Sequence, residues 1–315
     1  MEKFNLKKSA PPFALALFVV ILFPFLGTSY GVYLMVKIGI LSLYAIAFNV
    51  LFGYCGLLSF GHALFFSGSA YAIAISLVVF DLPLWAGIGI ALAVPVASSL
   101  VVGFLSLRHR EIHFAMITLA LSMLFWGIVV KSRNVTGGED GLAGISRGMS
   151  VKSFYFLSYG VVFFCAGVIY RIVKSDFGLL LRGIRENEVR IKFSGHSIMK
   201  LRIAAMVVSA LFTGIAGILW TFVDGTATPS ICHWSFSAIP VIATLIGGPQ
   251  SFAGPVVGTV VYVLAEDIIT KYTMYWQVFL GVLILAIVLF FRGGVVGIVT
   301  EKLLSPAFKR AKGGT

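Results

Sequence analysis

Long stretches without a single charged residue divide this chain, and they constrain its fold more than any other feature. Eight runs lack Asp, Glu, Lys and Arg, and most are about 20 residues long, the length that a helix needs to cross a bilayer. The runs are 10–27, 38–80, 82–107, 112–130, 153–170, 203–223, 225–265 and 272–291. Only 11% of the residues are charged, against about 25% in soluble domains, so the chain is suited to a membrane and not to water.

Two of these runs are too long for one crossing. Runs 38–80 and 225–265 each hold about two helix lengths, and each contains a Gly-rich interruption, at 53–56 and at 247–249. A turn at each interruption gives ten crossings, and a re-entrant segment in place of a turn would lower that number. The sequence therefore predicts an all-α polytopic membrane protein with about ten transmembrane helices, in a single transmembrane domain over residues 1–315.

The positions of the basic residues predict the orientation. With ten crossings, eighteen of the 24 Lys and Arg residues fall on the side of the N-terminus and five on the other side, while Lys37 lies at the edge of a span. Because basic loops stay inside, both termini and the 171–202 loop are predicted to be cytoplasmic, with the 131–152 loop outside. The net charge of +12 is thus a sign of topology, not of nucleic-acid binding. The first run, 10–27, is expected to be a retained span, since it is long and no clear cleavage site follows it.

No motif for covalent chemistry is present. The sequence has no His-Glu-x-x-His, Walker or Gly-x-Ser-x-Gly pattern, and Cys55, Cys165 and Cys232 lack metal-ligand or disulfide-framework spacing. We therefore expect no catalytic, cofactor or metal site in this chain, so that ATP and Mg²⁺ would be bound by partner subunits. The main alternative to transport powered by ATP is an ion-gradient-driven secondary transporter. Such proteins place ionisable groups in mid-membrane, where these runs have none.

Polar residues inside the long run 38–80 are candidates for a translocation path. Asn49, Ser59 and His62 lie where uncharged polar side chains usually face the interior of a helix bundle. They either line the path or hydrogen-bond helices to one another. Farther along, Gly247, Gly248, Gly254, Pro255 and Gly258 favour close helix packing or a kink.

The loop between the spans at 112–130 and 153–170 is a second candidate site. It contains Thr136, Gly137, Gly138 and Asp140. Its glycines permit tight turns with exposed backbone N–H groups, which suit a carboxylate or a docked protein. A plain Gly-rich loop fits the same residues.

The segment 171–202 is the only sizeable loop predicted on the cytoplasmic side between spans. Its spacing predicts a short helix with an apolar face that consists of Leu180, Ile184, Ile191 and Phe193. Arg182 with Glu186 and Arg185 with Glu188 are spaced for surface ion pairs, and Gly195 is expected to end the helix. The segment is either a positive-inside loop or a docking site for a cytoplasmic partner.

Four stretches together resemble the permeases of branched-chain amino acid ABC importers, and more specifically the M-type subunit. They are Asn49 to Ala63 (N-V-L-F-G-Y-C-G-L-L-S-F-G-H-A), Thr136 to Leu142 (T-G-G-E-D-G-L), Asp176 to Gly195 with its R-E-N-E core, and Gly247 to Gly258. The resemblance runs from about Asn49 to Gly297.

The resemblance implies a set of partners and a place in the cell. They are two ABC ATPase subunits, a sister permease and an extracytoplasmic substrate-binding protein, in the inner or plasma membrane of a prokaryote. The implied cargo is a branched-chain or other small amino acid, and other members carry small amides such as urea. In that family the 171–202 segment is the ATPase coupling loop. Its candidate contact residues are Asp176, Arg182, Arg185, Glu186, Asn187, Glu188 and Gly195.

Overall fold

The computed structural model describes residues 23–24, 28–108, 111–273, 275, 277–279, 281–282, 285 and 294. Within these residues the fold is helical apart from one pair of two-residue strands, as the all-α prediction requires. The elements are α2 Ser29–Asn49, η1 Val50–Tyr54, α3 His62–Val78, α4 Leu84–Ser106, α5 Glu111–Lys131, α6 Arg133–Thr136, β1 Leu142–Ala143, α7 Val151–Lys174, α8 Asp176–Glu186, α9 Glu188–Phe193, α10 Ile198–Asp224, β2 Thr226–Ala227, η2 Pro229–Cys232, α11 Trp234–Gly247 and α12 Gly254–Tyr272.

Five of the described helices are long and apolar enough to cross a membrane. They are α2 with η1 (Ser29–Tyr54), α4, Ile112–Lys131 in α5, α7 and α10. The helices α3 and α11 are apolar but shorter. The predicted first and last spans, 10–27 and 272–291, lie largely outside the described residues. The chain is therefore a multi-pass helical membrane protein, and the number ten stays a prediction.

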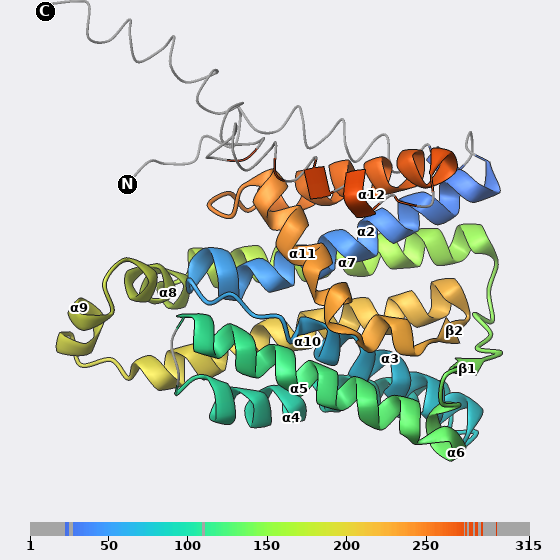
Figure 1. The fold of residues 1–315 in the computed structure, drawn as a ribbon, viewed down its shortest axis with the longest axis horizontal. Helices are drawn as coiled ribbons and strands as arrows, with labels where there is room; N and C mark the ends of the chain where they lie inside the picture. Colours follow the sequence, from blue (N-terminus) through green and yellow to red (C-terminus); the bar gives the residue numbers. More distant parts are fainter. Residues whose placement is uncertain are drawn as a thin grey trace, which may run out of the picture.

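Helix α2 lies at the centre of the bundle, among α7, α10, α11 and α12 (Figure 1). Of its apolar stretch, 83% is buried inside the chain, against 28% for α4 and 22% for the α5 span. Four aromatic rings fill the centre: the ring of Phe66 lies 5.0 Å from Tyr44, 6.0 Å from Trp220 and 4.8 Å from Phe236. The peripheral helices α4 and α5 keep apolar faces that suit lipid or another subunit.

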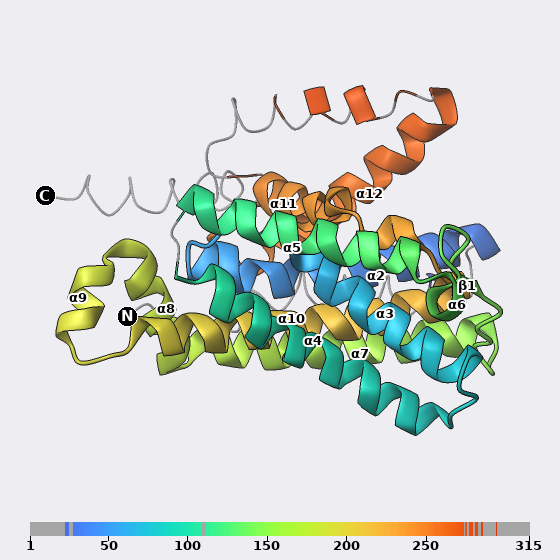
Figure 2. The ribbon, with the colours of Figure 1, turned by 60° about the horizontal axis from the view of Figure 1, so that its bottom comes forward.

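The two ends of the bundle differ (Figure 2). Helices α8 and α9 project at one end, here called the α8 end, while α6, β1 and β2 lie at the other, the α6 end. The loops 131–152 and 171–202 thus lie at opposite ends, which is the relative placement that the sequence predicts.

Each long uncharged run contains a non-helical segment that enters the bundle, near the Gly-rich interruption in run 38–80 but at the start of run 225–265. After η1 the chain returns into the bundle as a non-helical segment, residues 55–61, and α3 then begins beside the middle of α10. After α10 the chain re-enters from the α6 end through β2 and η2 before α11 begins. Non-helical backbone at membrane depth is tolerated where protein surrounds it, and Leu57, Ser59 and Gly61 are all buried.

The expected glycine packing is present between α11 and α12. A Cβ atom on Gly258 would collide with the backbone oxygen of Ala243, and one on Gly247 would collide with the backbone of Gly254. The two helices therefore approach each other more closely than larger residues allow.

Candidate translocation path and coupling segment

Asn49 is the last residue of α2 and is buried, with 2% of its surface exposed. Its Nδ2 donates a hydrogen bond to the backbone oxygen of Pro249, 3.2 Å away, in the loop between α11 and α12. One turn later, a Cβ atom on Gly53 would collide with both the Asn49 side chain and that same oxygen. Asn49 thus faces the protein interior and ties the end of α2 to a loop 200 residues away.

His62 is the first residue of α3 and Ser59 lies in the non-helical segment before it, and both are fully buried. The His62 Nε2 atom lies 2.8 Å from the Ser209 hydroxyl on α10, and that hydroxyl donates to the backbone oxygen of Ala47, 2.7 Å away. Since the single hydroxyl proton is used on Ala47, His62 Nε2 is the donor to Ser209. Ser59 accepts a hydrogen bond from the Gly61 backbone N–H at 3.2 Å. His62 therefore joins three helices, which fits the role of helix-helix contact.

Two side chains of α5, which the sequence analysis missed, hold the non-helical segments. Thr118 Oγ1 accepts from the Phe60 backbone N–H at 3.2 Å, and Ser122 Oγ donates to the Cys232 backbone oxygen at 3.3 Å. Both residues are fully buried and lie four positions apart, hence on one face of the helix. A polar pair at this spacing in an apolar helix was the available signal.

An apolar groove of about 460 Å³ lies between the first non-helical segment and α5. Along that segment the exposure alternates as in an extended strand: Leu58 and Phe60 are partly exposed, whereas Ser59 is buried. The groove is lined by Gly56, Leu58, Phe60, Ile112, Ala115, Met116 and Leu119. The Phe60 ring makes an edge contact with Trp234, the first residue of α11, at 6.4 Å. The side chains on this surface are thus neighbours of the predicted path residues, not those residues themselves.

The candidate outer-loop residues form a compact turn at the α6 end. Thr136 is buried, and its hydroxyl lies 2.6 Å from the backbone oxygen of Val129. Gly137 and Gly138 follow α6, and Asp140 is exposed. The residues are close in space, and the exposed carboxylate of Asp140 disfavours the binding of a free carboxylate by like-charge repulsion.

This turn is joined to the second non-helical segment. Leu142 pairs with Ala227 and Ala143 with Thr226 in the β1–β2 ladder. Gly141 has a left-handed backbone, φ 72°, and a Cβ atom there would collide with the backbone oxygen of Ala227. The two loops therefore form one surface, and that surface is continuous with the start of α11.

Charged residues lie deeper than the sequence analysis predicts. Because α2 begins at Ser29, Lys37 is inside the helix, about 12 Å from its first residue, and not at the edge of a span. Its ammonium group pairs with Glu266 of α12 at 3.6 Å. The long stem of lysine allows such a placement beside a partner.

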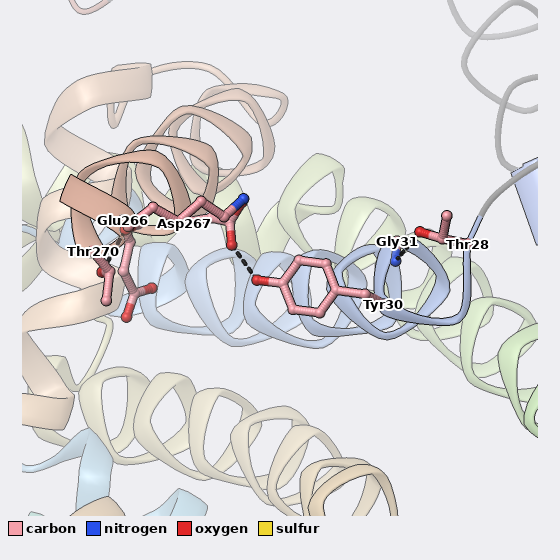
Figure 3. A network of polar contacts seen from close by, with 7 residues as sticks. Thr28, Tyr30, Gly31, Glu266, Asp267 and Thr270 are labelled. Carbon is pink, nitrogen blue, oxygen red and sulfur yellow. Dashed lines mark hydrogen bonds and ion pairs between the residues drawn. The ribbon is translucent and has the colours of Figure 1, made fainter.

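Two further contacts surround this ion pair near the α6 end. Tyr33 donates to Asp224 at 2.9 Å. Nearer the start of α2, Tyr30 points across to Asp267 of α12 (Figure 3). The residues 266 and 267, which fall between the charge-free runs 225–265 and 272–291, thus belong to α12 and connect it to α2.

The candidate coupling segment, 171–202, turns sharply between α7 and α8. A Cβ atom on Gly178 would collide with the backbone oxygen of Val173, so glycine is required for this close turn. Asp176 lies in the first turn of α8, where a negative charge is favourable. Asn187 separates α8 from α9, and its side chain accepts a hydrogen bond from the Arg190 N–H at 3.0 Å.

The predicted apolar face of this segment is wrong in part. The segment is two helices and not one, because Asn187 takes an extended backbone and caps α9. Leu181 and Ile184 are buried against the bundle, whereas Phe193 is 87% exposed. Gly195 ends the second helix as predicted, with φ 84°. Ile184 is thus not available as part of an apolar docking face.

Three of the charged residues have partners within the chain. Arg185 donates to the backbone oxygen of Gly53, and the Arg182 guanidinium lies 5.0 Å from the centre of the Tyr54 ring. Glu188 forms an ion pair with Arg202 of α10 at 3.2 Å. Glu186 is exposed. The segment is therefore attached to the bundle by charged side chains at both of its helices.

Long apolar helices, buried polar contacts between them and a charged helical segment at one end define the class of polytopic α-helical membrane proteins. The family described as the permease component of branched-chain amino acid transport systems matches residues 30–288. The chain belongs to this family.

Individual relatives agree with the family. The chain is 23% identical over 300 residues to the high-affinity branched-chain amino acid transport system permease protein LivM of Salmonella typhimurium, which covers 85% of this chain and 71% of the relative. It is 24% identical to LivM of Escherichia coli, covering 74% of this chain and 62% of the relative. It is 28% identical to a probable LivM of Methanocaldococcus jannaschii, covering 78% and 82%. No solved structure matches the chain significantly.

Proposed function

We propose that this chain is a transmembrane permease subunit of an ATP-driven ABC importer for branched-chain or other small apolar amino acids. The observation that carries the proposal is the charged segment α8–α9, attached to the broken end of α2 within a bundle of this permease family. The sequence contains no nucleotide-binding motif, so ATP can act only through contact with another subunit. The exposed side of α8–α9 is the surface available for that contact.

The proposed system contains two ABC ATPases, a sister permease and an extracytoplasmic binding protein. The α8 end is assigned to the cytoplasm, since Arg171, Lys174, Lys192 and Lys200 lie there beside the arginines of α8. The paired loops at the α6 end are then assigned to docking of the binding protein. The membrane is the inner or plasma membrane of a prokaryote.

The groove beside α5 is the proposed wall of the translocation path on this subunit. An apolar amino acid resists membrane passage only because it is a zwitterion, whose ammonium and carboxylate are costly to desolvate. The apolar lining by Leu58, Phe60 and Met116 suits the side chain of such a cargo. The sister permease would close the open side of the groove.

Reconstitution tests this function. The chain is co-purified with its candidate partners and placed in proteoliposomes, and uptake of labelled leucine, isoleucine and valine is measured. We expect uptake to require internal ATP and the binding protein, and to persist when ionophores collapse all ion gradients. Uptake without ATP that disappears with the ionophores would establish the secondary transporter instead.

Cysteine labelling tests the orientation. In a chain whose buried cysteines Cys55, Cys165 and Cys232 are replaced by alanine, Asp140→Cys and Arg190→Cys each add one exposed thiol. An impermeant maleimide on whole cells should label Asp140→Cys and leave Arg190→Cys unlabelled until the cells are opened. The reverse pattern would invert the assigned orientation.

A further inference from the structure

Helix α8 contacts the end of α2 through two arginines on neighbouring turns. The Arg185 guanidinium donates to the Gly53 backbone oxygen, and the Arg182 guanidinium lies over the Tyr54 ring. Both contacted residues belong to the π-helical segment η1, Val50–Tyr54. The contact between the two elements therefore falls on a local irregularity of the central helix.

The irregularity explains why a backbone oxygen is open to Arg185. A helix leaves its last carbonyl groups without helical partners, and π-helical turns are rare and occur often at functional sites. The N–H groups that follow Gly53 bond to other carbonyl oxygens: Gly56 N to Phe52 O at 3.2 Å and Leu57 N to Leu51 O at 3.0 Å. The guanidinium of Arg185 thus donates to a helix-end carbonyl oxygen that these two N–H groups do not use.

The same turn of η1 touches the loop between α11 and α12. Gly53 has no side chain, so Pro249 and Asn49 pack directly against its Cα, and Asn49 bonds to the Pro249 oxygen. Arg185 on one side and Pro249 on the other are thus separated by a single residue, Gly53. If Arg185 displaces the Gly53 peptide, the atoms joined by the Asn49–Pro249 hydrogen bond must shift as well.

There is also space for such a displacement. A cavity of about 400 Å³ lies at the junction of α8, η1 and the α11–α12 loop. It is lined by Gly53, Tyr54, Arg182, Arg185, Glu186 and Gln250. Transmission of movement through the junction requires the η1 turn to change its hydrogen-bond register, for example from π-helical to α-helical bonding, within this space.

We propose that Arg185 is a positioning residue that transmits movement of α8 to the π-helical end of α2, and through Asn49 to the α11–α12 loop. This inference rests on the proposed function, in which α8 receives the movement from an ATPase. Arg185 then acts within the chain, as the link between the ATPase contact and the path, and not as a contact to the ATPase itself.

The first test measures the ratio of substrate uptake to ATP hydrolysis in the reconstituted complex. Arg185→Met keeps an unbranched stem but removes all guanidinium donors, and Arg171→Met is a matched control on the exposed last turn of α7. Loss of a charged hydrogen bond predicts a fall of about tenfold or more in uptake per ATP for Arg185→Met. The control should keep the ratio of the parent complex.

The second test follows the junction directly. Cys55 comes immediately after η1 and is buried, so slow alkylation of its thiol reports local opening. With Cys165 and Cys232 replaced by alanine, the parent complex should show a maleimide labelling rate that changes several-fold between the resting and the ATP-trapped state. Arg185→Met should remove this dependence on ATP, which a purely structural contact would not do.

The outcomes separate the two proposals. If the parent complex takes up no amino acid with ATP, the proposed function fails. If the parent works and Arg185→Met keeps both its uptake per ATP and its ATP-dependent Cys55 labelling, the transmission role of Arg185 is wrong. Should Arg185→Met be lost from the membrane, Arg185→Leu serves in the same comparison, because it is a smaller apolar side chain that also removes every donor to the Gly53 oxygen. A ratio and labelling equal to the parent would overturn the proposal there as well.

Discussion

The backbone N–H of Ala63 donates a hydrogen bond to the hydroxyl of Ser237, 2.7 Å away, and this bond joins the starts of two short helices. Helix α3 runs from this point towards the α6 end, and α11 runs from it towards the α8 end. The non-helical segment before α3 enters the bundle from the α8 end, and the segment before α11 enters it from the α6 end. The two N-termini therefore meet inside the bundle, and the Ser237 hydroxyl satisfies an N–H group that no helical carbonyl can reach.

Replacement of Ser237 tests the strength of this junction. Ser237→Ala leaves the buried Ala63 N–H without its acceptor, which should destabilise the protein by about 1–3 kcal/mol. Ser98→Ala is the control, because Ser98 bonds only to Pro95 of its own helix among the described contacts. The fraction of folded protein that survives heating in detergent is the measurement. Equal survival of both variants would mean that Ala63 finds another acceptor.

Replacement of Asn49 separates a path role from a structural one. Asn49→Leu keeps the side-chain volume close but removes the donor to Pro249. We expect uptake to slow while the amount of protein in the membrane stays near the parent level, because one hydrogen bond is worth only about 1 kcal/mol. Asn134→Leu, on the exposed face of α6, is the control. Normal uptake at normal abundance would assign Asn49 to structure alone.

A charge exchange tests the deep ion pair between α2 and α12. Lys37 and Glu266 side chains are each 23% exposed, so their attraction is only partly screened and is worth about 1 kcal/mol. Lys37→Glu alone places two carboxylates together and should lower the thermal stability, and adding Glu266→Lys should restore most of the loss. Thermal unfolding of the three proteins is compared. A double variant as unstable as the single one would show that the ion pair does not join the helices.

The paired loops at the α6 end can be tested with two glycines. Gly141→Ala strains a left-handed backbone and also presses on the Ala227 oxygen, so the β1–β2 pairing should be lost. Gly144→Ala has a similar backbone, φ 89°, but no atom within 4 Å, so it carries the strain without the collision. Binding-protein affinity should fall much further for Gly141→Ala. The same affinity in both variants would remove these loops from the docking surface.

The broad architecture was predictable because it depends on local composition. Charge-free runs locate the long apolar helices, and the glycines at 53–56 and 247–249 lie where η1 and α11 end, since both signals are confined to a few neighbouring residues. The close approach of Gly247 and Gly258 to backbone across the α11–α12 pair follows from residue size alone. These features need no knowledge of which helices become neighbours.

What escaped prediction depends on long-range partners. Residues 55–61 carry no charge, so their composition does not distinguish a turn from a segment that re-enters the bundle. Lys37 is accommodated inside α2 by residues distant in sequence, among them its ion-pair partner Glu266 and the ring of Trp220. Thr118 and Ser122 acquire their importance from Phe60 and Cys232, which no periodicity connects to them.

Gly195 offers a test of the coupling segment in which strain alone changes. Its φ of 84° lies in the left-handed region, and no atom lies within 4 Å of the place of a Cβ atom, so a side chain meets no collision there. Gly195→Val is strongly disfavoured in this conformation, whereas Gly195→Asn is tolerated because Asn adopts left-handed backbone readily.

In the proposed importer, the strained variant should misdirect the chain between α9 and α10. We therefore expect Gly195→Val to abolish substrate-stimulated ATP hydrolysis while binding-protein docking stays intact, and Gly195→Asn to keep most of the stimulation. ATPase activity of the reconstituted complex, with and without binding protein and amino acid, is the measurement. Full stimulation in Gly195→Val, with the complex assembled, would show that the exit from α9 has no part in coupling.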